Sequence, residues 1–284
     1  MLLIGSRAAR LHFSDFREAK DWDVVVDDHE YAELVLRLGM PLAEPSGETS
    51  IFRHHGTLYE LKRARHRPLW SAVLDHEPES SEGEFETELP LLGRCRIASP
   101  PLLLILKQCF IAYPIYHWRK SLLDYHFLKE RIRCVPPKVL ELSRVAVEEA
   151  RERFSQYLEP GGNTTLTCAH ATRRVVNEGR HRALHARFSV GTASLVECPD
   201  AWKGFSTHPI EMRRSRMIEL LVEEALVVAR ERQEDAGEEV ALEKLCHWTL
   251  RMLITQHLPL PWRYFAADHF PQIQAALKAR NWGA

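Results

Sequence analysis

The stretch Asp21-Trp22-Asp23-Val24-Val25-Val26 decides the fold of the N-terminal part of the chain. Its three consecutive valines form a β-branched run that is too short for the core of a helix and is typical of a buried strand. Residues two apart on a strand point to the same face, so Asp21 and Asp23 are expected to project together. Because two neighbouring carboxylates repel each other, a divalent metal is the natural group to offset that repulsion.

Segments on both sides of this stretch predict a small mixed α/β unit. An apolar run precedes Gly5-Ser6, and His55-Gly56 reads as the turn of a hairpin. The expected elements are a strand at 2–4, a helix at 7–12, a strand at 24–26, a helix at 29–37 that stops before Gly39 and Pro41, and strands at 51–52 and 57–61.

Glu60 lies between Tyr59 and Leu61 in one of these strands and can add a third carboxylate to Asp21 and Asp23. Three hard oxygen ligands suit Mg²⁺ or Mn²⁺, which retain waters and bind the phosphates of a substrate. Gly5-Ser6 falls where a strand passes into a helix, a place where backbone N–H groups and a hydroxyl can hold phosphate.

The rest of the chain reads as helical after Pro100-Pro101. Residues 75–88 hold seven carboxylates and no lysine or arginine, which predicts a solvated loop. The expected fold class is therefore α+β, with a small mixed-sheet domain at 1–95 and a larger α-helical domain at 96–284. Helices are predicted at 102–112, 116–131, 137–158, 213–234 and 242–257.

The motifs of the first 130 residues resemble those of the DNA polymerase β-type nucleotidyltransferase superfamily. These motifs are Gly5-Ser6 after a short strand, the Asp21-x-Asp23 pair on the next strand, and the later Glu60 between hydrophobic residues. The segment Lys120-Ser121-Leu122-Leu123-Asp124 is similar to the helical signature of the small nucleotidyltransferases, with Ser121 in place of an aspartate. The second half also loosely resembles phage-type nucleotidyltransferase-like proteins.

The resemblance implies transfer of a nucleoside monophosphate from an NTP to a hydroxyl, with Mg²⁺ or Mn²⁺ and release of pyrophosphate. It assigns the metal and the catalytic role to Asp21, Asp23 and Glu60. Nucleotide binding falls to Gly5, Ser6, Arg7, Lys120 and Asp124, with Ser6 and Arg7 on the β- and γ-phosphates and Asp124 orienting Lys120 or an arginine. The hydroxyl acceptor stays open between an RNA 3′ end, a protein and a small molecule.

Three other interpretations remain. One is a catalytically silent nucleotide- or RNA-binding regulatory module on the same fold. In the second, Asp21 and Asp23 are turn and strand-edge residues while Glu60 pairs with Lys62 or Arg63. In the third, the protein is a helical interaction protein in which the Asp-x-Asp pair is accidental.

Basic clusters offer a local RNA contact on a chain whose net charge is only −1. They are Arg53, Lys62, Arg63, Arg65 and Arg67; then Arg173, Arg174, Arg180, Arg182 and Arg187; then Arg213, Arg214 and Arg216. The third reads as a solvated helix face balanced by glutamates, and the aromatic residues between Trp262 and Phe270 favour core packing over base stacking.

Composition sets the broad class. Apolar residues make up 45% and charged residues 27% of 284 residues, which excludes a fibrous repeat and a wholly disordered chain. Six scattered cysteines without a CxxC motif predict buried free thiols in a reducing, cytoplasmic compartment. No segment reads as a signal peptide or membrane span, so no membrane partner is expected, and nothing fixes the oligomeric state.

Overall fold

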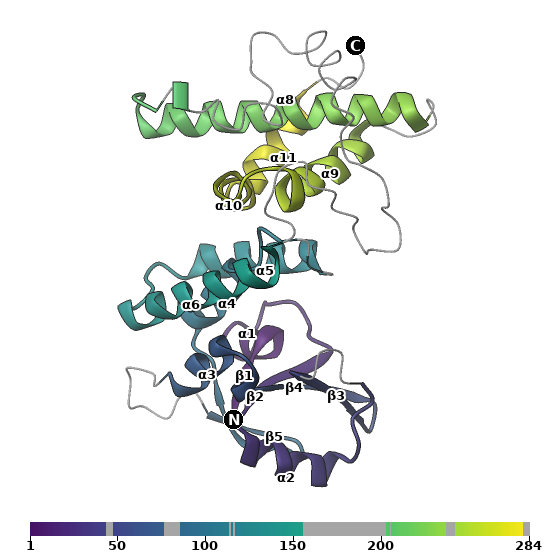
Figure 1. The fold of residues 1–284 in the computed structure, drawn as a ribbon, viewed down its shortest axis with the longest axis vertical. Coiled ribbons are helices and arrows are strands. Elements are labelled where there is room, and N and C mark those ends of the chain that lie inside the picture. The colour runs from purple at the N-terminus through teal and green to yellow at the C-terminus, as the bar shows by residue number, and fades with distance from the viewer. Residues whose placement is uncertain are drawn as a thin grey trace. The chain divides into compact units, whose positions relative to one another are not determined.

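The computed structural model describes residues 1–43, 48–76, 86–113, 115, 117–155, 203–204, 206–236 and 242–280. The chain forms two compact units (Figure 1). The first contains Met1–Phe110 and Arg119–Arg153, and the second contains Ile111–Trp118 and Phe154–Ala284. The predicted limit at residue 95 between a sheet domain and a helical domain stays a prediction, since the first unit also holds helices beyond that residue.

The first unit is built on a six-stranded mixed sheet with the strand order β3-β4-β2-β1-β6-β5. β2 pairs antiparallel with β1 and parallel with β4, and β1 also pairs parallel with β6. The edges are closed by the antiparallel pairs β3–β4 and β5–β6. The strands are β1 (Leu2–Ile4), β2 (Asp21–Val26), β3 (Thr49–His54), β4 (Thr57–Arg63), β5 (Glu86–Leu89) and β6 (Gly93–Ile97).

Helices cover both faces of this sheet. Helix α2 lies on one face, and α1 and α3 lie on the other, with α4 and α6 packed beyond them (Figure 1). The bounds are α1 (Gly5–His12), α2 (Asp28–Leu38), the 3₁₀ turn η1 (Ala64–His66), α3 (Pro68–Asp75), α4 (Pro100–Gln108), α5 (Trp118–Arg131) and α6 (Pro137–Arg153). The core between the layers consists of buried aliphatic side chains such as Leu3, Val24 and Leu61.

Local sequence explains where these elements begin and end. Helix α2 starts at a capping box, in which the Asp27 carboxylate accepts from the Glu30 N–H and the Glu30 carboxylate accepts from the Asp27 N–H. It ends at Gly39, whose φ of +83° is a conformation that glycine adopts readily. The hairpin between β3 and β4 turns at His55 and Gly56, both with positive φ, as the sequence predicts.

The α+β fold class is confirmed, because strands and helices of the first unit form one mixed sheet with helices on its faces. One expectation is wrong in part: Glu86–Leu89 of the acidic segment forms strand β5. An edge strand has one bare side, so its glutamates stay in solvent, and Glu86 also pairs with Arg94. Residues 77–85 of that segment lie outside the described residues.

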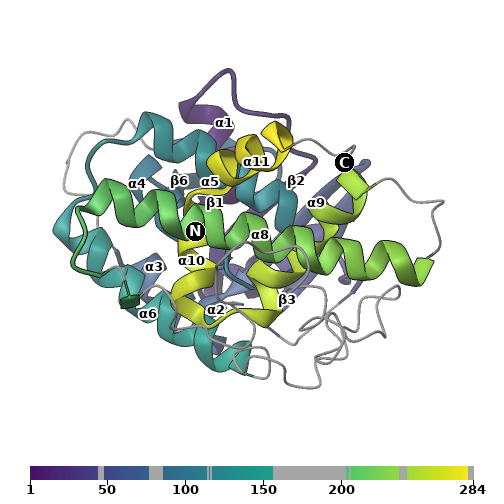
Figure 2. The same cartoon turned by 90° about the horizontal axis from the view of Figure 1, so that it is seen from above.

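The second unit is helical in its described part. The long helix α8 (Ile210–Ala236) contacts α9 (Leu242–Met252) and α11 (Phe270–Ala279), and α10 (Leu260–Asp268) lies beside them (Figure 2). A π-helical turn, η5 (Leu253–His257), joins α9 to α10, and the buried Arg263 donates to the carbonyls of Thr255 and Leu258 at its end. Of the aromatic stretch, Trp262 is buried, while Phe270 is partly exposed and packs edge-on against Trp118, so core packing is confirmed for Trp262.

Among the described residues, none of the helices has the length and hydropathy required to cross a membrane.

Candidate functional site: a carboxylate cluster beside a cation network

The register of the sheet brings two of the predicted carboxylates together. Asp23 on β2 lies directly opposite Glu60 on the parallel strand β4 and opposite Ile4 on β1. Their side chains share one face of the sheet, because strand residues in direct register point the same way. Both carboxylates keep contact with solvent, with 19% of the Asp23 side chain and 34% of the Glu60 side chain exposed.

The ammonium of Lys62 joins this pair. Lys62 is two residues beyond Glu60 on β4, and its Nζ lies 2.5 Å from Glu60 Oε1 and 3.2 Å from Asp23 Oδ1. Burial alone would lower the pKa of Lys62, but the two carboxylates outweigh it and hold the pKa above its ordinary value. We call Asp23, Glu60 and Lys62 the carboxylate cluster; its formal charge is one negative unit.

Gly5 packs directly against Asp23. A Cβ atom placed on Gly5 would lie 2.3 Å from Asp23 Oδ2, and Gly5 has a φ of +71°, so a side chain is excluded by space and disfavoured by conformation. The glycine therefore makes room for the Asp23 carboxylate at the point where β1 passes into α1. Such a carboxylate, beside a second one in register, is a donor set that fits a hard divalent cation.

Asp21 shares the face of Asp23 but is not drawn into the cluster. It is partly buried and lies opposite Leu58 of β4, one step further along the strand pair. Within the described ranges no group of three His, Cys, Asp or Glu side chains is gathered closely enough to hold a metal ion. The structure thus brings together Asp23 and Glu60 of the three predicted ligands, with Asp21 adjacent on the same strand.

A second set of charged residues starts at Ser6, the neighbour of Gly5. Arg17 donates from Nη2 to Ser6 Oγ and holds Asp124 with two hydrogen bonds, of 2.6 Å from Nε and 2.7 Å from Nη2. Lys107 Nζ lies 2.9 Å from the same carboxylate. We call Ser6, Arg17, Lys107 and Asp124 the cation network; its formal charge is one positive unit.

Asp124 is the buried centre of this network, with only 1% of its side chain exposed. Burial would raise the pKa of Asp124, but the hydrogen bonds and charges of Arg17 and Lys107 outweigh it and lower the pKa below its ordinary value. A buried carboxylate that is already bonded on both oxygens can orient the two cations and cannot itself contact a nucleotide. The side chains of Arg17 and Lys107 are 31% and 22% exposed, respectively.

Two predicted phosphate ligands lie elsewhere. In the described part of the chain Lys120 has no hydrogen bond or ion pair, and Asp124 holds Arg17 and Lys107 in its place. Arg7 lies over the ring of Trp22, with Cζ 4.4 Å from the ring centroid. Trp22 alternates with Asp23 along β2, so this ring belongs to the face opposite the carboxylate cluster.

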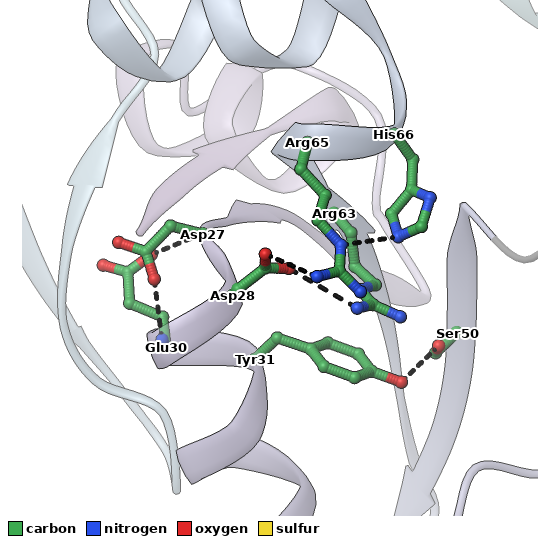
Figure 3. Close-up of polar contacts among 8 residues, drawn as sticks. All are labelled: Asp27, Asp28, Glu30, Tyr31, Ser50, Arg63, Arg65 and His66. Carbon is green, nitrogen blue, oxygen red and sulfur yellow. Dashed lines mark hydrogen bonds and ion pairs between the residues drawn. The ribbon is translucent and has the colours of Figure 1, made fainter.

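The first basic cluster is largely paired with acids. Arg63 and Arg65 reach Asp28 of α2, at 3.4 Å and 2.8 Å, and Arg63 also lies over the ring of Tyr31 (Figure 3). Lys62 belongs to the carboxylate cluster, and Arg67 pairs with Glu149 and Glu48. Within the described residues the exposed Arg53 forms no hydrogen bond or ion pair, so the cluster offers a nucleic acid little unpaired charge.

The other basic clusters add little. Arg214 pairs with Glu211 and Arg216 with Glu219 on α8, as expected for a solvated helix face balanced by glutamates. The cluster between Arg173 and Arg187 lies outside the described residues.

None of the described cysteines belongs to the carboxylate cluster or to the cation network. The described cysteines Cys95, Cys109, Cys134 and Cys246 are free thiols, and of these Cys134 is exposed. Burial raises the pKa of Cys95 to about 11 and of Cys109 to about 12, so both stay protonated and unreactive at neutral pH.

Sequence reasoning missed Arg17 and the role of Lys62. Arg17 lies in a polar loop and has no motif of its own, and its partner Asp124 is 107 positions away. A signal existed for Asp124, since a carboxylate flanked by Leu122, Leu123 and Tyr125 on a helix needs a cation once buried. Lys62 was visible as a partner of Glu60, but its reach to Asp23 depends on the pairing of β2 with β4.

Comparison with known families adds one match. The family model described as "Domain of unknown function (DUF7277)" matches residues 1–60. That stretch runs from β1 into β4 and includes Gly5, Ser6, Asp21, Asp23 and Glu60. No curated protein matches the chain.

Proposed function

We propose that the protein is a metal-dependent nucleotidyltransferase that transfers a nucleoside monophosphate from an NTP to a hydroxyl and releases pyrophosphate. One observation carries the proposal: consecutive residues link an acidic site to a basic one. Gly5 packs against Asp23 of the carboxylate cluster, and Ser6 accepts from Arg17 of the cation network. A reaction on a triphosphate requires these two environments side by side, one for the metal and one for the phosphate charge.

In this proposal each group of residues has one task. Asp23 and Glu60, with Asp21 two residues away on the same face, hold Mg²⁺ or Mn²⁺. The ion supplies charge neutralisation and activation of the acceptor hydroxyl when bound. Ser6, Arg17 and Lys107 bind the phosphate oxygens by charge-assisted hydrogen bonds, and Asp124 fixes the two cations in position. Lys120 and Arg7 keep their predicted phosphate role only if their side chains turn toward the nucleotide.

Gly5 contributes by leaving space. Because the glycine has no side chain, the Asp23 carboxylate can approach the start of α1, whose backbone N–H groups favour an anion. The acceptor hydroxyl stays open between an RNA 3′ end, a protein side chain and a small molecule. The pairing of the first basic cluster with acids gives no support to RNA over the other acceptors. A reducing, cytoplasmic location fits the buried thiols.

The test is transfer of label from each of the four NTPs, labelled on the α-phosphate, in Mg²⁺ or Mn²⁺, with bulk RNA or without. The proteins compared are the wild type, Asp23→Asn, Glu60→Gln and the matched surface control Asp15→Asn. We expect label to move onto an acceptor with wild type and the control, and the two site variants to lose the activity by at least 100-fold. Lack of transfer by wild type with every NTP and acceptor would contradict the proposal.

A second candidate is a catalytically silent nucleotide-binding module on the same fold. The Lys62 ammonium favours it, because a cation supplied by the chain already neutralises part of the charge of Asp23 and Glu60. This candidate predicts NTP binding that needs Arg17 and Lys107 but neither transfers label nor responds to Asp23→Asn. Isothermal titration with an NTP, run with and without Mg²⁺ on the same variants and on Arg17→Met and Lys107→Met, separates the two.

A further inference from the structure

Lys62 occupies a defined place between two carboxylates. Its Nζ contacts one oxygen of each, Glu60 Oε1 at 2.5 Å and Asp23 Oδ1 at 3.2 Å, and only 12% of its side chain is exposed. Lys62 is two residues beyond Glu60 on β4, so both side chains point to the same face of the sheet as Asp23. Such a contact offsets the repulsion between two carboxylates held in register by the sheet.

A metal ion bound to the same acids would meet this ammonium. Mg²⁺ binds oxygens at about 2.0–2.1 Å and prefers octahedral geometry, so it must contact the carboxylates directly or through its waters. Lys62 already engages one oxygen of each of these acids. Because two cations on the same oxygens repel each other, the metal and the ammonium exclude one another at this position.

An aromatic ring also lies close to the ammonium in its present position. The ring of Trp70 on α3 lies on the same side of the sheet, with its centroid 6.0 Å from Lys62 Nζ. An aromatic face at this range attracts a cation, and a tryptophan ring is the strongest of the common ones. The ammonium thus has this ring as a neighbour besides the two carboxylates, and Arg67 contacts the same ring, with Cζ 5.1 Å from its centroid.

We propose that Lys62 is an internal counter-ion that competes with the divalent metal for Asp23 and Glu60, so that metal binding displaces its ammonium. Lys62 is a positioning and regulating residue in this scheme. In the metal-free protein it keeps the two strands' acids together; during metal binding it sets the concentration of ion that the site requires. The inference rests on the proposed function in one respect, namely that the same two carboxylates are metal ligands.

The first experiment measures the binding of Mn²⁺ alone, without nucleotide, by electron paramagnetic resonance. Lys62→Met removes the competing charge, and Lys62→Arg keeps it. Lys138→Met is the matched control, because it makes the same change of charge at an exposed position of helix α6. We expect Lys62→Met to bind Mn²⁺ about five- to tenfold more tightly than wild type, the factor that corresponds to one ion pair. Lys62→Arg and Lys138→Met should bind as wild type does.

The second experiment uses the wild-type protein, so it does not depend on the folding of a variant. Acetylation of lysines by a limiting amine-reactive reagent is followed by mass spectrometry, with and without saturating Mg²⁺. Displacement predicts that labelling of Lys62 rises several-fold with Mg²⁺, while labelling of Lys138 does not change. Equal or lower labelling of Lys62 in Mg²⁺, or Mn²⁺ affinity that is the same in Lys62→Met and wild type, would overturn the inference.

The failure of this inference can be told from the failure of the proposed function. Tighter Mn²⁺ binding by Lys62→Met that Asp23→Asn abolishes in the double variant supports the competition, whether or not any NTP is turned over. Transfer of label that is lost in Asp23→Asn, together with unchanged Mn²⁺ binding in Lys62→Met, keeps the nucleotidyltransferase and removes the competition.

Discussion

The carboxylate cluster and the cation network contain acidic and cationic side chains in opposite proportions. The first has two acids for one cation, and its acids face solvent in part; the second has two cations for one acid, and its acid is buried. The buried acid is fully used by its partners, so it serves as an anchor. The acids of the carboxylate cluster are partly open to solvent, so a ligand can reach them. Burial, more than residue type, separates structural charge from charge available to a ligand.

The largest effect expected from breaking this contrast is that of Asp124→Asn. The substitution leaves Arg17 and Lys107 close together without their shared carboxylate, and loss of one partner of a buried ion pair costs about 3 to 5 kcal/mol of unfolding free energy. Urea unfolding followed by circular dichroism measures it. Asp15→Asn, at an exposed pair with Arg131, is the control and should change the free energy by less than about 1 kcal/mol. Equal effects of the two would mean that the network is not an anchor.

Gly5→Ala is expected to come next. It forces a side chain into a position with φ of +71° and against Asp23 Oδ2, for a combined loss of about 2 to 3 kcal/mol. Gly56→Ala is the control, because Gly56 has a φ of +81° with nothing within 4 Å of the added Cβ. The difference between the two variants isolates the contact with Asp23. Thermal unfolding measures stability, and Mn²⁺ binding should weaken only in Gly5→Ala; the same loss in both variants would contradict the close approach.

Acid should weaken the protein through the cation network. The pKa of Asp124 is lowered in the folded state, so the unfolded chain takes up this proton first as the pH falls below the ordinary value of 3.8. The contribution of Asp124 is complete above that pH and is lost as the pH falls through the folded pKa. Urea midpoints at several pH values between neutrality and pH 3 should therefore fall more steeply for wild type than for Asp124→Asn. Parallel curves would show that the pKa is not lowered.

The smallest expected effect is that of Asp28→Asn. Asp28 also serves two cations, Arg63 and Arg65, but 44% of its side chain is exposed (Figure 3). Solvent screens this pairing, so Asp28→Asn should cost about 0.5 kcal/mol and leave metal and nucleotide binding unchanged. Asp28 and Asp124 thus share a charge pattern and differ in burial. Similar losses of unfolding free energy in the two variants would show that burial is not the deciding variable.

Much of the first unit could be predicted from periodicity and turn chemistry. The three valines of β2, the stripe of α2 and the His55-Gly56 turn are local signals, and the structure places strands and a helix there. Strands β5 and β6 were not predicted, since Glu86–Leu89 is dominated by charge and β6 depends on pairing with the distant strand β1. Helix α3 was not predicted either: it has only eight residues and directly follows a basic turn.

The candidate site could likewise be predicted from the sequence only in part. Asp23 and Glu60 could be predicted because Asp23 directly precedes the valines of β2 and Glu60 lies between Tyr59 and Leu61, and the pairing of β2 with β4 brings the two together. The role of Arg17 and the contact of Lys62 with Asp23 could not be predicted from the sequence, because each depends on which segments pack side by side. The metal, nucleotide and acceptor assignments stay predictions that the transfer assay tests.

The parallel pairing of β2 with β4 also has a consequence for the order of folding. The β3–β4 hairpin closes through a two-residue turn and can form within microseconds, whereas Lys62 and Asp23 are 39 positions apart and meet only when that hairpin docks on β2. A docking shifted by one residue would send Glu60 to the wrong face while preserving the hairpin. Binding of Mn²⁺ during refolding would therefore report the arrival of the correct register, later than any probe of secondary structure.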